Sequence, residues 1–231
     1  MTRSALIVAH GSPSDPDPQE AAVKDLAGRV GALLPGWRIG GATLAKEGAF
    51  DAAVADLGAP WIYPYFMARG YFTKRVLAER AEPLGLRVLE PFGTEPALVT
   101  SAAHALRRAL GDKGWQAAET TLLVAAHGSN VSRTSAESAR DFAAALEAEI
   151  GFAKARVGYV EEPPYLDESA RGLGQAICLP QFALNAGHML EDVPEALAEA
   201  GFAGPVLPAF IDWPEIPELI AQSLETQASS A

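Results

Sequence analysis

The tripeptide His-Gly-Ser occurs twice in this chain of 231 residues, each time directly after an apolar run. The run Leu6–Ala9 leads into His10, and the run Leu122–Ala126 leads into His127, 117 positions further along. Apolar runs of this length indicate buried strands, and their repetition at about half the chain length predicts two similar α/β units. In open α/β sheets, ligands bind beyond the carboxyl ends of the strands. The repeat therefore predicts a duplicated fold and the sheet edge where a site is expected.

The rest of the chain alternates short apolar or β-branched runs with longer segments of helical period. In the segment Glu20–Leu34, for example, Val23, Leu26 and Val30 recur at the spacing of one helix face. Strands are predicted at Ala5–Ala9, Arg38–Leu44, Trp61–Phe66, Arg87–Leu89, Thr121–Ala126, Lys154–Val160, Ala176–Phe182 and Pro205–Phe210. Helices are predicted at Glu20–Leu34, Phe50–Leu57, Thr73–Leu84, Glu95–Leu110, from about Thr134 onward, and at Leu166–Gly172, Val193–Ala200 and Pro214–Glu225.

The helix after His127 has a start signal, because Thr134 and Glu137 have the spacing of a capping box. Four strands and four helices in each half predict an α/β fold of two tandem doubly wound parallel four-stranded sheets, flanked by helices, with a cleft between the halves. The polar, glycine-containing stretch Gly111–Ala118 predicts the boundary, giving domains at 1–114 and 115–231.

The formal net charge of −11 excludes nucleic acid and anionic membrane as expected partners. The same charge opposes binding of an anionic ligand, unless a local cationic patch exists. No signal peptide or membrane span is predicted. A single cysteine rules out an intrachain disulfide and favours the reducing cytoplasm.

The third predicted strand of each half ends in the same pattern, Pro-x-Phe, starting at Pro64 and Pro180. Eight residues after the proline stands Phe72 in the first half and His188 in the second. The second half therefore has a second histidine in the predicted strand-end region where the first half has a phenyl ring.

The second predicted strand adds a carboxylate to one half only. Glu161 and Glu162 follow the strand that ends at Val160, whereas the counterpart around Leu44-Ala45-Lys46 carries no acid. His127, a glutamate and His188 thus lie at the ends of three neighbouring parallel strands. Two imidazoles and a carboxylate can bind a divalent metal or exchange protons near neutral pH.

These motifs together resemble the class II chelatases, the CbiX/SirB-type sirohydrochlorin cobaltochelatases and ferrochelatases. The similarity rests on Ala-His-Gly-Ser after a strand, Val160-Glu161, and Pro180-x-Phe182 followed by His188-x-x-x-Asp192-x-Pro194. It covers nearly the whole chain as two tandem units, as in the long forms of the family. The sequence departs from the family at Ala186, where a glycine is usual, and at Phe72, where the first half lacks the second histidine.

The resemblance implies a lyase of the metal-chelatase type, which inserts Co²⁺ or Fe²⁺ into sirohydrochlorin or a related tetrapyrrole in cobalamin or sirohaem synthesis. Ni²⁺ also suits the ligand set, and no organic cofactor is implied. By similarity, His127 binds the metal, His188 binds the metal or takes protons, and Glu161 assists them. Glu161 is preferred to Glu162 because it directly follows the strand-end Val160, as in the family.

Sirohydrochlorin carries eight carboxylates, so a cationic patch is expected, and guanidinium groups suit paired carboxylates. Candidate substrate-binding residues are Arg69, Lys74, Arg75, Arg133 and Ser129. Candidate accessory residues are His10 and Ser12.

Two other functions fit parts of the pattern. One is a non-catalytic carrier of metal or tetrapyrrole that uses the same fold. The other is a hydrolase or mutase that uses the histidines, although the chain has neither a Gly-x-Ser-x-Gly elbow nor a Walker phosphate loop. The sequence leaves the oligomeric state open.

Overall fold

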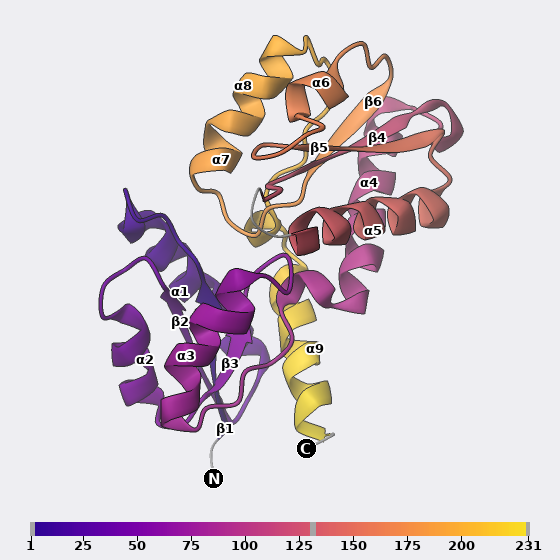
Figure 1. The fold of residues 1–231 in the computed structure, drawn as a ribbon. Coiled ribbons are helices and arrows are strands. Elements are labelled where there is room, and N and C mark those ends of the chain that lie inside the picture. Colours follow the sequence, from indigo (N-terminus) through magenta and orange to yellow (C-terminus); the bar gives the residue numbers. More distant parts are fainter. Residues whose placement is uncertain (1–2, 130–132, 230–231) are drawn as a thin grey trace. The chain divides into compact units, whose positions relative to one another are not determined.

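Two three-stranded parallel sheets organise the computed structural model, which describes residues 3–129 and 133–229 (Figure 1). Their strand orders are β2–β1–β3 and β5–β4–β6, so the strand before each His-Gly-Ser is the central one. The strands are β1 (Arg3–Ala9), β2 (Trp37–Thr43), β3 (Trp61–Pro64), β4 (Thr121–Ala126), β5 (Lys154–Tyr159) and β6 (Ala176–Pro180). The helices are α1 (Pro16–Leu33), α2 (Ala49–Leu57), α3 (Leu77–Ala81), α4 (Pro96–Lys113), α5 (Arg133–Ile150), α6 (Leu166–Ala170), α7 (Gly187–Leu190), α8 (Asp192–Glu199) and α9 (Ile216–Ser229).

Helices cover both faces of each sheet, as a doubly wound fold requires. In the first sheet, Leu6 and Val8 of β1 are fully buried and belong to one apolar cluster with residues of α2 and α3. In the second, Leu123 and Ala125 of β4 pack with residues of α6 and α8. Side chains alternate along a strand, so the intervening residues face α1 and α5, which contact β1 and β4. The α/β class and the parallel strands are confirmed.

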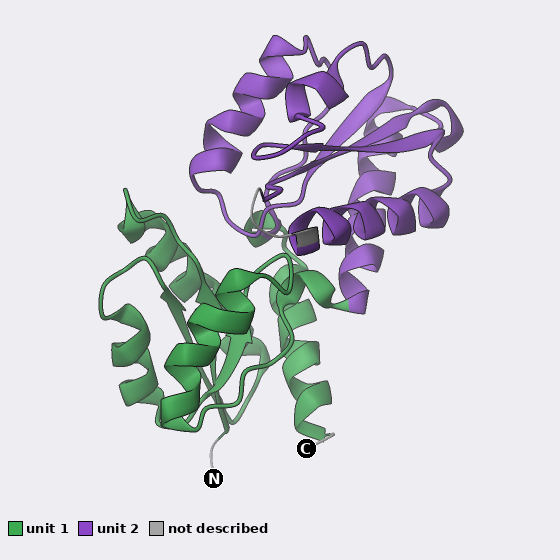
Figure 2. Cartoon of the chain, viewed as in Figure 1, with its two compact units in different colours: residues 1–95, 211–231 green, residues 96–210 purple. Residues whose placement is uncertain are grey.

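The last helix of each half packs in the other unit (Figure 2). The chain divides into unit 1, residues 1–95 and 211–231, and unit 2, residues 96–210. In unit 2, α4 packs beside α5, and in unit 1, α9 packs beside α1. The compact units thus differ from the predicted domains 1–114 and 115–231. The apolar stripe of a helix shows that one face is buried but not which sheet covers it, so the sequence pattern alone does not assign α4 and α9 to a unit.

The predicted fourth strand of each half is not a full strand. Within the described residues, Val88 forms one isolated bridge with Ile62, and Val206 forms one with Cys178. Pro91 and Pro208 follow closely and lack the N–H that a longer ladder needs. The prediction of four-stranded sheets is therefore wrong by one strand in each unit.

Two helix predictions also need correction. The segment predicted as one helix over Thr73–Leu84 is a π-helical turn over Phe72–Val76, then α3, then a 3₁₀ turn over Glu82–Leu84. Helix α5 begins at Arg133, so Thr134 lies inside its first turn rather than at the N-cap of a capping box. Over the described residues, none of the helices combines the length and apolarity needed to cross a bilayer.

The cysteine lies in the core of unit 2. Cys178 on β6 has no exposed surface, and burial raises its pKa to about 12. The thiolate is the reactive form of cysteine. We therefore expect a thiol reagent such as Ellman's reagent to leave the native protein unlabelled at neutral pH and to label it after unfolding in guanidinium chloride. Rapid labelling of the folded protein would contradict this packing.

Candidate metal centre

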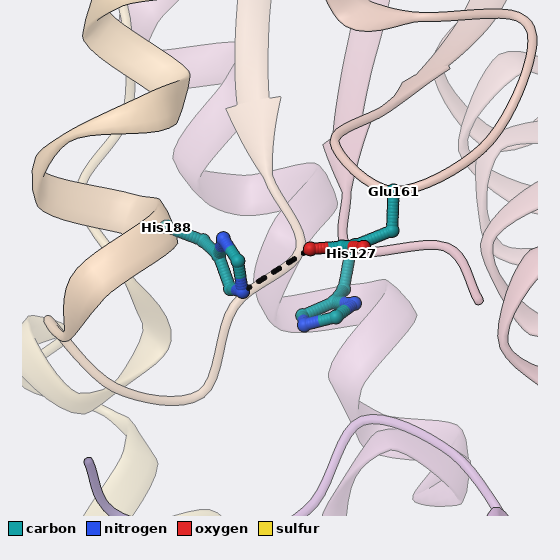
Figure 3. Close-up of side chains that lie close together, drawn as sticks. All are labelled: His127, Glu161 and His188. Atoms are coloured by element: carbon teal, nitrogen blue, oxygen red, sulfur yellow. Dashed lines mark ion pairs between the residues drawn. The ribbon is translucent and has the colours of Figure 1, made fainter. Parts of the chain in front are cut away.

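Three elements of unit 2 bring His127, Glu161 and His188 together (Figure 3). His127 directly follows β4, Glu161 comes two residues after β5, and His188 lies on α7, which follows the loop after β6. The carboxyl ends of parallel strands meet at one sheet edge, so residues distant in sequence become neighbours there.

The three side chains have the spacing of a metal-binding group. One donor atom from each residue lies within 4.8 Å of the other two. His188 Nε2 is 3.8 Å from Glu161 Oε1, and the imidazole rings of His127 and His188 are 4.4 Å apart, edge to face at 84°. Metal–nitrogen and metal–oxygen bonds are about 2.0–2.2 Å long, so one ion bridges donors up to about 4.2 Å apart. Small side-chain rotations are enough to close these three donors on one ion.

The backbone fixes the two donors that come from neighbouring strands. The amide of Val160 donates to the carbonyl of Ala126 at 3.0 Å, and the amide of Glu161 donates to the carbonyl of His127 at 2.9 Å. The parallel ladder thus continues one step beyond β4 and β5. His127 is exposed, and Glu161 and His188 are half-buried, so the group is open to an incoming reactant.

Glu162 has a different contact from Glu161. Its Oε1 accepts a hydrogen bond from the backbone amide of Ser129 at 2.8 Å. This bond ties the loop after β4 to the loop after β5. Ser129 is half-buried.

Gly128 is required by this loop. Its φ of +74° lies in the left-handed region, and a Cβ there would stand 2.9 Å from Glu162 Cγ and 3.0 Å from Tyr159 Cβ. We expect Gly128→Ala to cost more than the roughly 1–2 kcal/mol of the backbone conformation alone, and to weaken metal binding by displacing the loop. Thermal unfolding and calorimetric titration with Co²⁺ measure both effects.

Gly151 offers a matched control. Its φ is +79°, yet a Cβ there meets nothing within 4 Å. Gly151→Ala should lower the free energy of unfolding by the cost of the left-handed backbone conformation and leave Co²⁺ affinity unchanged. Equal effects of the two substitutions on Co²⁺ affinity would contradict the role of Gly128 in shaping the site.

Unit 1 contains the structural counterpart of this group. The amide of Ala45 donates to the carbonyl of His10 at 2.9 Å, as that of Glu161 does to His127. Phe72 contacts His10 with ring centroids 4.0 Å apart, as His188 contacts His127. The site of unit 2 is therefore His-Glu-His, and the equivalent positions of unit 1 hold His-Ala-Phe.

Two further aromatic rings pack against Phe72 in unit 1. Phe66 stacks on Phe72 at 6.2 Å, and Tyr71 meets Phe72 edge-on at 5.5 Å. The Oγ atoms of Ser12 and Ser14 are 3.0 Å apart. The side chains of Phe72 and Ala45 supply no metal ligand. Of the three equivalent positions in unit 1, His10 alone therefore carries a donor side chain, whereas all three positions in unit 2 carry one.

The candidate cationic residues of unit 1 lie on one segment. Arg69 forms an ion pair with Glu90 at 2.6 Å, and Arg75 forms one with Glu79 at 3.0 Å. Lys74 is exposed. Arg133, in unit 2, is the first residue of α5, and its side chain lies outside the described part of the structure.

Asp192 contacts His188, although the sequence pattern assigned Asp192 no role in the site. Its Oδ2 lies 2.9 Å from His188 Nδ1. The signal was the four-residue spacing in His188-x-x-x-Asp192, which places both side chains on one side of a helical segment. Ala186, the departure from the family pattern, has φ of −146° and ψ of 161°, which an alanine adopts without strain.

Comparison with protein families matches the CbiX model over residues 121–226. Among solved structures, CbiX, described as the terminal enzyme for siroheme biosynthesis in denitrifying bacteria, is 45% identical, with a TM-score of 0.89 over 97% of this chain and 99% of that chain. A search of curated proteins gives no match.

Two more distant structures share the fold. SirB from Bacillus subtilis with Fe³⁺ is 16% identical, with a TM-score of 0.74 over 99% of this chain and 96% of that chain. A multi-domain protein from Deinococcus radiodurans with similarity to chelatases is 22% identical, with a TM-score of 0.69 over 97% of this chain and 54% of that chain. With 45% identity to CbiX over nearly its whole length, the chain belongs to the CbiX family of metal chelatases.

Proposed function

We propose that this protein is a lyase that inserts a divalent metal, Co²⁺ or Fe²⁺, into sirohydrochlorin or a closely related tetrapyrrole. The observation that carries the proposal is the group of His127, Glu161 and His188, whose donor atoms lie within 4.8 Å of one another at an open sheet edge. Membership in the CbiX family supports the same reaction, since the similar CbiX acts in siroheme biosynthesis.

The donor set suits a metal that must be handed on. Two neutral imidazoles and one carboxylate neutralise only half of a divalent charge, so the ion keeps affinity for further anionic ligands. The tetrapyrrole must lose two N–H protons as its nitrogens replace the protein ligands. Each side chain that releases the metal becomes a base beside the ring, so His188 and Glu161 can accept the departing protons.

The carboxylates of the substrate require cations. Arg69, Lys74 and Arg75 supply them in unit 1, and the two arginines already pair with glutamates at the surface. Surface ion pairs are worth about 0–1 kcal/mol, so substrate carboxylates can replace Glu90 and Glu79 at small cost. Arg133 and Ser129 are the proposed substrate-binding residues of unit 2.

An anaerobic spectroscopic assay tests the proposal. Sirohydrochlorin mixed with Co²⁺ or Fe²⁺ should change its visible spectrum faster with the protein than without it. Tight binding of metal or tetrapyrrole without acceleration would instead indicate the carrier function. Metal-independent turnover of phosphate or acyl esters would indicate the hydrolase alternative.

Competition assays between metals, and between tetrapyrroles, test which metal and which tetrapyrrole the protein uses. Imidazole and carboxylate ligands accept Co²⁺, Fe²⁺ and Ni²⁺, so the ligand set alone does not select one of them. Sirohydrochlorin should be compared with its less oxidised precursor and with decarboxylated analogues. A cytoplasmic location stays a prediction from the single cysteine.

A further inference from the structure

The two histidines of the metal centre are oriented by different groups. His127 Nδ1 lies 3.0 Å from the carbonyl oxygen of Gly128, and His188 Nδ1 lies 2.9 Å from the carboxylate of Asp192. A carbonyl oxygen and an ionised carboxylate only accept hydrogen bonds. In each neutral imidazole the proton therefore sits on Nδ1, and the lone pair sits on Nε2.

The contact with Asp192 aims the lone pair of His188 at the centre of the donor group. Nδ1 faces Asp192, and Nε2 on the other side of the ring faces Glu161 Oε1 at 3.8 Å. That distance is too long for a hydrogen bond and suits two ligands of one ion. Asp192 is the first residue of α8, and His188 lies four residues earlier on the four-residue helix α7. The side chain of His188 is half-buried.

We propose that Asp192 is the positioning residue of the metal centre, which fixes the Nδ1–H tautomer and the ring orientation of His188 so that Nε2 can bind the metal. The inference rests on the proposed function of the His127, Glu161 and His188 group. Carboxylate partners of this kind orient metal-binding imidazoles and strengthen them as donors, and their loss costs about 10–100-fold in metal affinity. Asp192 itself does not touch the metal or the tetrapyrrole.

Calorimetric titration of the metal-free protein with Co²⁺, without tetrapyrrole, tests this role. Asp192→Ala should lower Co²⁺ affinity by about 10–100-fold. Asp192→Asn keeps a hydrogen-bond acceptor beside His188 Nδ1 without the charge, so this variant should lose less Co²⁺ affinity than Asp192→Ala. Asp167→Ala is the matched control, because Asp167 also lies in the first turn of a short helix of unit 2 and also forms a contact four residues away, with Arg171.

Nitrogen NMR of the metal-free protein gives a readout that a purely structural role would not move. At mildly alkaline pH, the ¹⁵N shifts of His188 should report the Nδ1–H tautomer in the parent and a mixture of tautomers in Asp192→Ala. The tautomer of His127 should stay unchanged in both. This measurement also applies to Asp192→Asn, which keeps the hydrogen bond and so preserves the fold.

The outcomes separate this inference from the proposed function. If His127→Ala and His188→Ala lose Co²⁺ binding while both Asp192 variants stay within about twofold of the parent, the positioning role is wrong and the metal centre stands. If His127→Ala and His188→Ala leave Co²⁺ binding intact, the metal centre itself is wrong. An unchanged tautomer of His188 in Asp192→Ala would also overturn the positioning role.

Discussion

Replacing His188 with alanine is expected to lower kcat/KM for metal insertion by about 10²–10⁴-fold, the range associated with losing a positioned acid–base group. In the proposed metal centre, the substitution removes one of three donors and leaves Glu161 and His127 to hold the ion alone. His127→Ala should have an effect of similar size, because it removes the donor that directly follows the central strand β4. The spectroscopic insertion assay at saturating and limiting metal separates loss of binding from loss of turnover.

The other two histidines are the controls for these variants. His104 is exposed on α4 and is not part of the group of His127, Glu161 and His188, so His104→Ala should leave kcat/KM unchanged. His10→Ala should be milder than His127→Ala, because the counterparts of Glu161 and His188 beside His10 are Ala45 and Phe72. Equal losses for His10→Ala and His127→Ala would contradict a centre built from unit 2 alone.

The duplication made most of the fold predictable, because buried central strands give the same apolar run in both halves. Leu6–Ala9 and Leu122–Ala126 lie on β1 and β4 as expected. The missing fourth strands and the exchanged helices α4 and α9 depend on longer-range contacts. A short apolar run does not predict how many backbone hydrogen bonds it forms with a neighbouring strand. The apolar stripe of a helix does not predict which sheet the helix packs against.

The grouping of the candidate site residues was predictable where these residues follow strands directly. His127 and Glu161 are held by continued ladder bonds, so their adjacency follows from strand order. His188 lies on a four-residue helix that follows a loop. Its position near His127 was indicated only by aligning the two halves on Pro-x-Phe, which makes it equivalent to Phe72, the ring that contacts His10. The hydrogen bond between His188 Nδ1 and the Asp192 carboxylate requires the turn between α7 and α8, which hydrophobic periodicity does not describe.

The equivalence of the two units predicts that a metal site can be built in unit 1. In a His127→Ala, His188→Ala background, we expect the further pair Ala45→Glu and Phe72→His to restore the binding of one Co²⁺ per chain. These changes place a carboxylate and an imidazole at the positions whose backbone and ring contacts match Glu161 and His188. Calorimetric stoichiometry and the visible spectrum of bound Co²⁺ measure the outcome.

The rebuilt site should be weaker than the natural one, because the residue four positions after Phe72 is Val76 rather than an aspartate. Adding Val76→Asp supplies a carboxylate for the new imidazole, and we expect it to raise Co²⁺ affinity by about tenfold or more. Glu79→Asp, on the same helical segment but paired with Arg75, is the control that should leave affinity unchanged. If Ala45→Glu with Phe72→His binds no Co²⁺, with or without Val76→Asp, then matching strand ends do not suffice to form the centre. In that case the loop and helix that carry His188 would have to supply the geometry that unit 1 lacks.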